Sequence, residues 1–160
     1  MLAYAATLLT LVVTITAHAE PTVVAEQIHS ERATFRVVRV AKGLTHPWSI
    51  TFLPDGGALI SERTGSLLRL DPKTGALSPV ISSLAVATVG QGGLLDVEPH
   101  PRFDENQLVY FSYSAGHSGN YATSIARGRL TDSSLDDIEV LFTMNRPSGS
   151  HLHFGSRLAF

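Results

Sequence analysis

Short runs of β-forming residues, separated by turn residues, constrain this 160-residue chain more than any other feature. From residue 35 onward, β-branched, aliphatic and aromatic residues gather in runs of five or six, at 35–40, 48–53, 58–62 and 66–70. Pro, Gly, Asp and Thr fill the intervals, and no helical periodicity is evident after the first 19 residues. Strands at such spacing indicate an all-β fold, with a sandwich, a barrel or a propeller as the candidates.

Two segments of the chain repeat one order of features: an apolar strand, a turn rich in Pro and Asp, and a second strand. The first copy begins at Trp48 and the second at Leu94, 46 residues later. One four-stranded propeller blade takes roughly 40–50 residues. The repeat fits a β-propeller, but two copies leave the sandwich and the barrel equally open, and residues 157–160 are compatible with the opening of a third copy.

The composition excludes several classes of function. The chain has no cysteine, which removes disulfide scaffolds, Cys-ligated zinc, iron–sulfur clusters and thiol nucleophiles. Its net charge of −2, without a basic run, gives no electrostatic footprint for nucleic acid, so we expect no nucleic-acid partner. Neither a Walker-type phosphate loop nor a dinucleotide fingerprint occurs, so nucleotide cofactors lack their signature.

The N-terminus is typical of an exported protein. Residues 1–19 carry no charged side chain, have an apolar centre at 8–15 and end in small residues at the positions that a signal peptidase recognises. We therefore predict a signal peptide over 1–19, with an uncleaved anchor or a buried helix as alternatives. Cleavage implies a periplasmic or secreted protein without stable membrane insertion. Residues 20–33, polar and mixed, are expected as a lead-in arm, and 34–160 as the propeller part.

Four motifs, in order along the chain, resemble the opening of the soluble PQQ-dependent aldose sugar dehydrogenases of the glucose/sorbosone dehydrogenase family. They are Gly43-Leu-Thr-His-Pro-Trp-Ser-Ile50 with Phe52-Leu-Pro-Asp-Gly56, Ser61-Glu-Arg-Thr-Gly65, Gly90-Gln-Gly-Gly-Leu-Leu-Asp-Val97 and His153-Phe-Gly-Ser-Arg-Leu158. The resemblance implies a propeller of six blades, of which this chain matches the first two to three. A closed propeller needs more blades than the chain supplies, so we expect a C-terminally truncated and inactive fragment of a larger enzyme.

The same resemblance assigns the chemistry and two site residues. It implies oxidation of the C1 hydroxyl of an aldose to a lactone by hydride transfer to PQQ, with an external electron acceptor. His153 matches the general base, a role that suits neutral imidazole near pH 7. Gln91 matches the position beside cofactor and substrate, where an amide can donate and accept hydrogen bonds. The family's calcium ligands, and the basic residues that hold the PQQ carboxylates, correspond to positions after residue 160.

Two features near His153 affect this assignment. In glucose-specialised members an acidic residue precedes the base, whereas Leu152 stands here, which places the chain nearer the broad-specificity aldose branch. In an extended segment His151 and His153 would share a face, but catalytic zinc requires three protein ligands. No residue of this chain is therefore assigned to a metal. Arg157 is left without a functional role, and Trp48 is expected to fill space between blades.

Two other classes of function stay open at this stage. One is a propeller that binds carbohydrate or protein without catalysis, because a fold does not fix a function. The other is a calcium-dependent lactonase-type propeller, in which a metal polarises a lactone carbonyl. Replacement of His153, and assays on an aldose and an aldonolactone with and without PQQ, distinguish these alternatives.

Overall fold

The computed structural model describes residues 20–160, and the predicted signal peptide over 1–19 lies outside this part of the chain. Ten strands and one short helix follow one another. Their bounds are β1 Thr22–His29, β2 Thr34–Arg39, β3 Pro47–Phe52, β4 Ala58–Glu62, β5 Leu67–Asp71, β6 Ala76–Val80, β7 Leu94–Pro99, α1 Phe103–Asn106, β8 Leu108–His117, β9 Asn120–Leu130 and β10 Leu135–Thr143. Within residues 20–160, no helix has the length and apolar character needed to cross a membrane.

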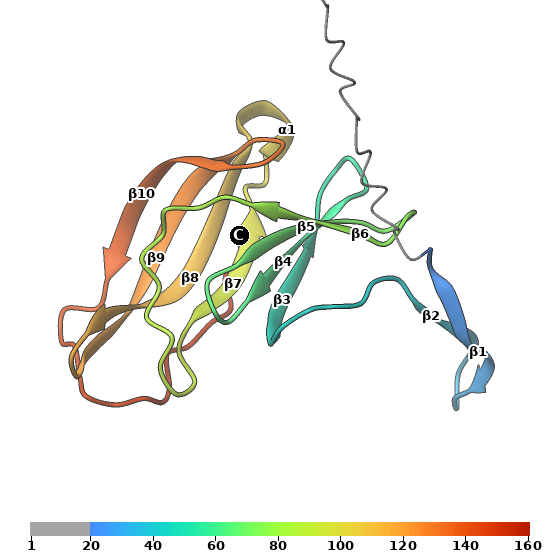
Figure 1. Cartoon of the computed structure of the whole chain (residues 1–160), viewed down its shortest axis with the longest axis horizontal. Helices are drawn as coiled ribbons and strands as arrows, with labels where there is room; N and C mark the ends of the chain where they lie inside the picture. Colours follow the sequence, from blue (N-terminus) through green and yellow to red (C-terminus); the bar gives the residue numbers. More distant parts are fainter. Residues whose placement is uncertain (1–19) are drawn as a thin grey trace, which may run out of the picture.

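Eight of the strands form two four-stranded antiparallel sheets of the same design. Neighbouring strands in each sheet are also consecutive in sequence, in the orders β3-β4-β5-β6 and β7-β8-β9-β10. We call these sheets blade 1 and blade 2. The inner strands β3 and β7 contact each other, and the two blades fan out from this line (Figure 1). The repeat seen in the sequence at Trp48 and Leu94 thus marks the inner strand of each blade.

The main core lies between the two blades. Blade 1 contributes buried Leu53, Leu59, Leu67 and Val80, and blade 2 contributes a larger set that includes Leu94, Val97, Val109, Phe111, Tyr113 and Ala126. Alternation along the strands produces this arrangement, because every second residue of a strand faces the same side. Burial of these apolar side chains is the main stabilising contribution to the packing of the two blades.

The opposite face of blade 1 has a smaller cluster of its own. Ala58, Ile60 and Leu70 are buried there, and residues 40–44 pack over them. On the same face, the inner strand β3 leaves Trp48, Ile50 and Phe52 exposed, at 43%, 51% and 71%. We expected Trp48 to fill space between blades. Within residues 20–160 it lies instead on the partly exposed face of blade 1, away from the core between the two blades.

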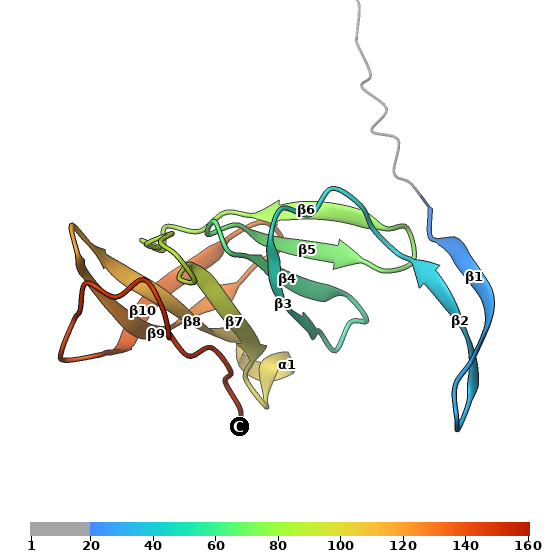
Figure 2. The same ribbon diagram turned by 90° about the horizontal axis from the view of Figure 1, so that it is seen from below.

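Residues 22–39 form a hairpin that stands apart from both blades. Strand β1, within the segment expected as a polar lead-in arm, pairs antiparallel with β2. Cross-strand pairs such as Ile28 with Phe35 and Val23 with Val38 supply the β-forming contacts. Both views show the hairpin projecting beyond the end of β6 (Figures 1 and 2). Strand β2 is therefore joined to the arm and not to the sheet of blade 1.

The strand directions place the connections at two opposite ends of the blades. One end carries the β3–β4, β5–β6 and β9–β10 turns together with α1, and we call it the turn end. The other end carries the β4–β5 and β8–β9 turns and the two long loops 81–93 and 144–153, and we call it the loop end. In Figure 1 the turn end of blade 2, with α1, is at the top and its loop end at the bottom, whereas the β5–β6 turn of blade 1 lies at the right.

The last residues run back from the loop end along blade 2. Residues 157–160, which we considered as the opening of a third copy, are not assigned to a strand in the structure. The Phe160 ring instead lies edge-on to Tyr110 and His100, with ring centroids 5.0 and 5.7 Å away. Figure 2 shows this final stretch passing beside β7 toward α1.

Candidate functional site

The structure brings Gln91 and His153 together at the loop end, although 61 residues separate them in sequence. The side-chain oxygen Oε1 of Gln91 accepts a hydrogen bond from the backbone N–H of His153 at 3.1 Å. The backbone N–H of Gln91 in turn donates to the carbonyl of His151 at 2.9 Å. Both predicted site residues are exposed, so their side chains are accessible to a ligand.

The Gly-rich loop that carries Gln91 fits closely against residues 151–154. A β-carbon on Gly90 would lie 2.2 Å from the carbonyl oxygen of His151, and Gly90 has a φ of +50°. A β-carbon on Gly92 would lie 2.5 Å from Ser114 Oγ and 3.0 Å from the Phe154 ring. Only glycine permits these close approaches. The spacing of glycines around Gln91 is therefore what lets the two loops meet.

Arg63, in the β4–β5 turn of blade 1, is a site residue that the sequence analysis did not single out. Its guanidinium Nη1 donates to the carbonyl of Gly90, and its own carbonyl accepts from Leu94 N–H at 3.1 Å. Its backbone N–H donates to the carbonyl of His46 at 3.0 Å. Arg63 therefore ties the Gly-rich loop of blade 2 to blade 1. The sequence analysis included Arg63 in the motif Ser61–Gly65 but gave it no role of its own.

Asp96 is a second residue that was not singled out. It lies in the inner strand β7 and is 2% exposed. Its Oδ2 accepts from Leu158 N–H at 2.6 Å, and its Oδ1 is 3.7 Å from the Arg157 guanidinium. A buried carboxylate is costly unless it is paired and hydrogen-bonded. A charged residue inside the apolar run Leu94–Val97 is a signal that sequence reasoning could have used.

Three more hydrogen bonds hold the segment after His153 on blade 2. Thr123 Oγ1 donates to the Phe154 carbonyl at 2.8 Å, and Ser112 Oγ donates to the Ser156 carbonyl at 2.5 Å. Trp48 Nε1, from the inner strand of blade 1, donates to Ser156 Oγ at 3.0 Å. With the contact to Asp96, these bonds explain why the His-Phe-Gly-Ser-Arg-Leu motif lies across both blades.

His153 itself adopts a left-handed backbone conformation, with a φ of +64°. The segment is therefore not extended at this residue, and the reasoning that set His151 and His153 on one face does not apply. The His151 ring packs edge-on to Tyr121 at 5.6 Å. Within residues 20–160, the His153 imidazole makes no hydrogen bond or ion pair with another side chain. It is exposed and available to exchange a proton with a bound molecule.

The surroundings of the pair are mostly uncharged. Leu152 precedes His153 and is 50% exposed. Tyr113 on β8 pairs with Leu94, the residue that follows the Gly-rich loop. Burial raises the pKa of the Tyr113 phenol above 10.0, so this side chain is neutral. In the part of the chain described, no three His, Asp or Glu side chains converge as a metal site.

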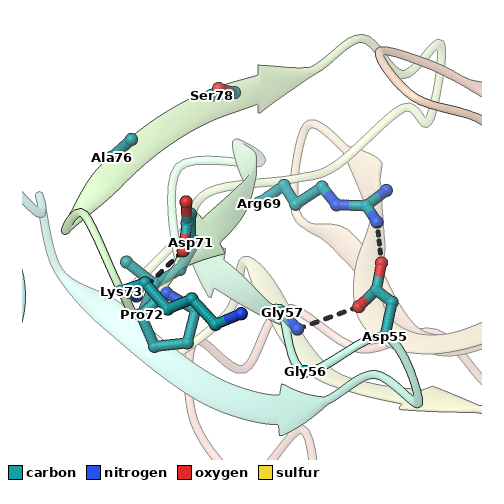
Figure 3. Close-up of a pocket in the computed structure, with 10 residues that line it drawn as sticks. Asp55, Gly56, Gly57, Arg69, Asp71, Pro72, Lys73, Ala76 and Ser78 are labelled. Carbon is teal, nitrogen blue, oxygen red and sulfur yellow. Dashed lines mark hydrogen bonds and ion pairs between the residues drawn. The ribbon is translucent and has the colours of Figure 1, made fainter.

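A cleft of about 330 Å³ lies at the turn end of blade 1, away from Gln91 and His153. Figure 3 shows Asp55 joined to Arg69 and to Gly57 N–H on one side, with Asp71 and Lys73 on the other. Both of its carboxylates already accept hydrogen bonds from neighbours, since Asp71 accepts from Lys73 N–H at 2.8 Å and Asp55 from Gly57 N–H at 2.8 Å. The cleft contains none of the predicted site residues.

Comparison with known proteins identifies the family. The family model "Glucose / Sorbosone dehydrogenase" matches residues 44–160, almost three-quarters of the chain. The chain belongs to the glucose/sorbosone dehydrogenase family. The resemblance drawn from the four motifs is thereby confirmed, and the match includes both Gln91 and His153.

Relatives of this family confirm the fold as well. The chain is 37% identical to aldose sugar dehydrogenase YliI of Escherichia coli over 132 residues, which cover 80% of this chain and 36% of that protein. The crystal structure of the E. coli aldose sugar dehydrogenase in its apo form superposes with a TM-score of 0.71 at 37% identity, covering 76% of this chain and 36% of the other. The all-β fold, as part of a propeller, is confirmed by these neighbours.

A third relative is the PQQ-bound form of aldose sugar dehydrogenase from Streptomyces coelicolor. It superposes with a TM-score of 0.64 at 25% identity, over 87% of this chain and 38% of that structure. The chain thus spans little more than a third of the length of the glucose/sorbosone dehydrogenase relatives it matches.

Proposed function

We propose that this chain supplies the first part of a PQQ-dependent oxidoreductase that oxidises the C1 hydroxyl of aldose sugars to lactones. The observation that carries the proposal is the 3.1 Å hydrogen bond between Gln91 and His153. It joins the two residues that match the family's cofactor-side and base positions. Two relatives are named as aldose sugar dehydrogenases, and one of their structures is described as PQQ-bound, which supports the substrate class and the cofactor.

The residues present fit one part of a PQQ site. Gln91 Oε1 is engaged by His153, while its amide nitrogen Nε2 makes no hydrogen bond with residues 20–160 and lies at an exposed position. An amide N–H of this kind can donate to a quinone or hydroxyl oxygen. Bound PQQ would supply the hydride acceptor, which the polypeptide lacks. The calcium ligands and the groups for the PQQ carboxylates belong, in our proposal, to the rest of the enzyme.

His153 would act as the general base. A ring nitrogen of the neutral imidazole accepts the proton of the C1 hydroxyl as the hydride leaves C1, which prevents charge from building up on the sugar oxygen. Its chain neighbours Leu152 and Phe154 are apolar and accept no proton themselves. Arg63 holds the Gly-rich loop through the Gly90 carbonyl, and Asp96 holds the segment after His153 through the Leu158 N–H.

The remaining partners and the location are also part of the proposal. An external electron acceptor reoxidises the cofactor between turnovers. The signal-like residues 1–19 would direct the protein to the periplasm or outside the cell. An aldose substrate reaches the loop end from solvent, where Gln91 and His153 are exposed.

The test uses the 160-residue chain and a chimera in which this chain replaces the matching third of E. coli aldose sugar dehydrogenase YliI. We expect the chimera to reduce a redox dye with aldoses only when PQQ and calcium are present. The chain alone is expected to be inactive. His153→Ala in the chimera should lower kcat by about 100-fold or more, the usual contribution of a positioned general base.

His29→Ala, at an exposed histidine of the β1–β2 hairpin, is the matched control and should leave kcat unchanged. An unchanged kcat in His153→Ala would overturn the role of the base. PQQ-dependent dye reduction by the chain alone would show that the inactivity proposal is wrong. Hydrolysis of an aldonolactone without PQQ would instead favour the lactonase class.

A further inference from the structure

The backbone at His153 adopts a conformation that residues with a β-carbon rarely take. A φ of +64° places it in the left-handed region, which costs free energy for any residue other than glycine. Such a conformation persists only when the surrounding structure fixes it. The contacts on either side of His153 therefore decide where its imidazole lies.

Two hydrogen bonds from one residue enclose this position. Gln91 N–H donates to the carbonyl of His151, and Gln91 Oε1 accepts from His153 N–H. We call this pair of bonds the Gln91 clasp. On the far side, Phe154 is 7% exposed and its carbonyl accepts from Thr123 Oγ1. The backbone is thus held before, at and after His153, while the ring remains exposed.

The chemistry of the clasp fixes which way the Gln91 amide points. Of the two polar groups of the Gln91 amide, only the oxygen accepts a hydrogen bond. The backbone N–H of His153 can therefore donate only to Oε1, which must face His153. The Nε2 group, which carries only donor hydrogens, is then left for a ligand. Gln91 would accordingly meet an acceptor oxygen of the ligand.

We propose that Gln91 is a positioning residue for His153, which sets the left-handed backbone at the base and presents only amide N–H donors to the ligand. That His153 acts as a base rests on the proposed function. The two hydrogen bonds of the clasp do not depend on it, because they are formed within the chain. This role goes beyond a contact between Gln91 and a cofactor or sugar, because it makes the geometry of His153 depend on the oxygen of Gln91.

The test uses the full chain, labelled with ¹⁵N, without cofactor or sugar. Left-handed residues show an unusually strong intraresidue HN–Hα cross-peak, which reports the φ of His153 directly. Gln91→Ala should weaken this cross-peak and make the His153 amide exchange about fivefold faster, the change expected for a lost hydrogen bond of ordinary strength. Gln91→Glu should retain both signals, because a carboxylate oxygen accepts the same N–H.

Gln107→Ala is the matched control. Gln107 is also exposed, but it lies after α1 at the turn end and bonds through Nε2 to the Phe103 carbonyl. We expect no change at His153 in this variant. Gly90→Ala provides an independent disturbance, because its β-carbon would collide with the carbonyl of His151 and should displace the clasp.

The outcomes separate this inference from the proposed function. An unchanged His153 signal in Gln91→Ala, or equal losses in Gln91→Ala and Gln91→Glu, would overturn the clasp. Neither measurement involves sugar oxidation, so an inactive chimera would refute the proposed function and leave the clasp intact. Rescue by glutamate is the result that a general loss of structure could not produce.

Discussion

Blade 1 and blade 2 have the same strand order, but their inner strands use different chemistry to hold the next inner segment of the chain. Ser49, on the inner strand of blade 1, accepts the backbone N–H of Val97 through its hydroxyl at 3.1 Å. Asp96, on the inner strand of blade 2, accepts the backbone N–H of Leu158 through its carboxylate at 2.6 Å. In both cases one polar side chain of an inner strand supplies the acceptor for this contact.

The charge of the acceptor is the difference between the two contacts. Hydrogen bonds to ionised groups are shorter and roughly twice as strong as neutral ones. The stronger one holds the segment that carries His153, whereas the weaker one joins two blades that already share an apolar core. Both blades thus use a side-chain acceptor on the inner strand for the backbone N–H of the next segment. The acceptor is charged in blade 2, where the segment it holds has less apolar packing.

The blades differ most in the burial of their aromatic side chains. Phe111 in blade 2 is 1% exposed within the core between the blades, while Phe52 on the inner strand of blade 1 is 71% exposed. Phe111→Ala should lower the free energy of unfolding by about 3–5 kcal/mol, because it leaves a cavity in a packed core. Phe52→Ala should change it by about 0.5 kcal/mol or less.

Urea denaturation of the full chain measures both values, with the slope m used to confirm that each variant unfolds like the parent. The same substitution at two sites makes each variant the control of the other. Equal losses would mean that the face of blade 1 with Phe52 is covered in solution, and that the burial in the structure describes blade 1 incorrectly.

The two inner-strand acceptors give the next prediction. Asp96→Ala should lower the free energy of unfolding by about 2–3 kcal/mol, because it leaves Leu158 N–H without its charged acceptor. Ser49→Ala removes a neutral acceptor and should cost about 1 kcal/mol. Asp96→Asn keeps an acceptor oxygen and should fall between the two. A smaller loss for Asp96→Ala than for Ser49→Ala would reverse the comparison of the blades.

Most of the blade framework could be predicted from local sequence. The runs 48–53 and 58–62 match β3 and β4 to within one residue, because alternating apolar residues bounded by turns leave little choice. The hairpin of β1 and β2 was missed as a pair, since its first strand mixes polar and apolar residues without a clear alternation and its apolar contacts appear only across the strands. The short α1 escaped detection because four residues are too few to show a period.

Candidate site residues could be named from the sequence, whereas the contacts between them could not. Gln91 and His153 were found through motifs, and the family match confirms the resemblance that those motifs carry. The hydrogen bond between them, and the roles of Arg63 and Asp96, depend on loops that meet across the fold. Local sequence cannot reveal such contacts, because segments far apart in the chain form them.

The third-to-fourth strand turns provide the smallest and most local contrast. In blade 1 the β5–β6 turn is closed by a carboxylate: Asp71 accepts from Lys73 N–H at 2.8 Å and from Thr74 Oγ1 at 2.9 Å. In blade 2 the β9–β10 turn is closed by a hydroxyl, with Ser134 N–H donating to Thr131 Oγ1 at 3.0 Å. Only the first of these acceptors titrates.

The bond from Lys73 N–H, followed by that from Thr74, lowers the pKa of Asp71 below 3.8. The stabilisation that this carboxylate gives its turn is therefore present above pH 3.8 and is lost as the pH falls through the lowered pKa. We expect the Lys73 amide resonance to shift in that range, because its acceptor is the carboxylate that takes up the proton. Asp71→Ser, which places a hydroxyl at the same position, should abolish the shift at Lys73. A shift at Lys73 that persists in Asp71→Ser would mean that the Asp71 carboxylate is not its cause, and the contrast between the two turns would then be lost.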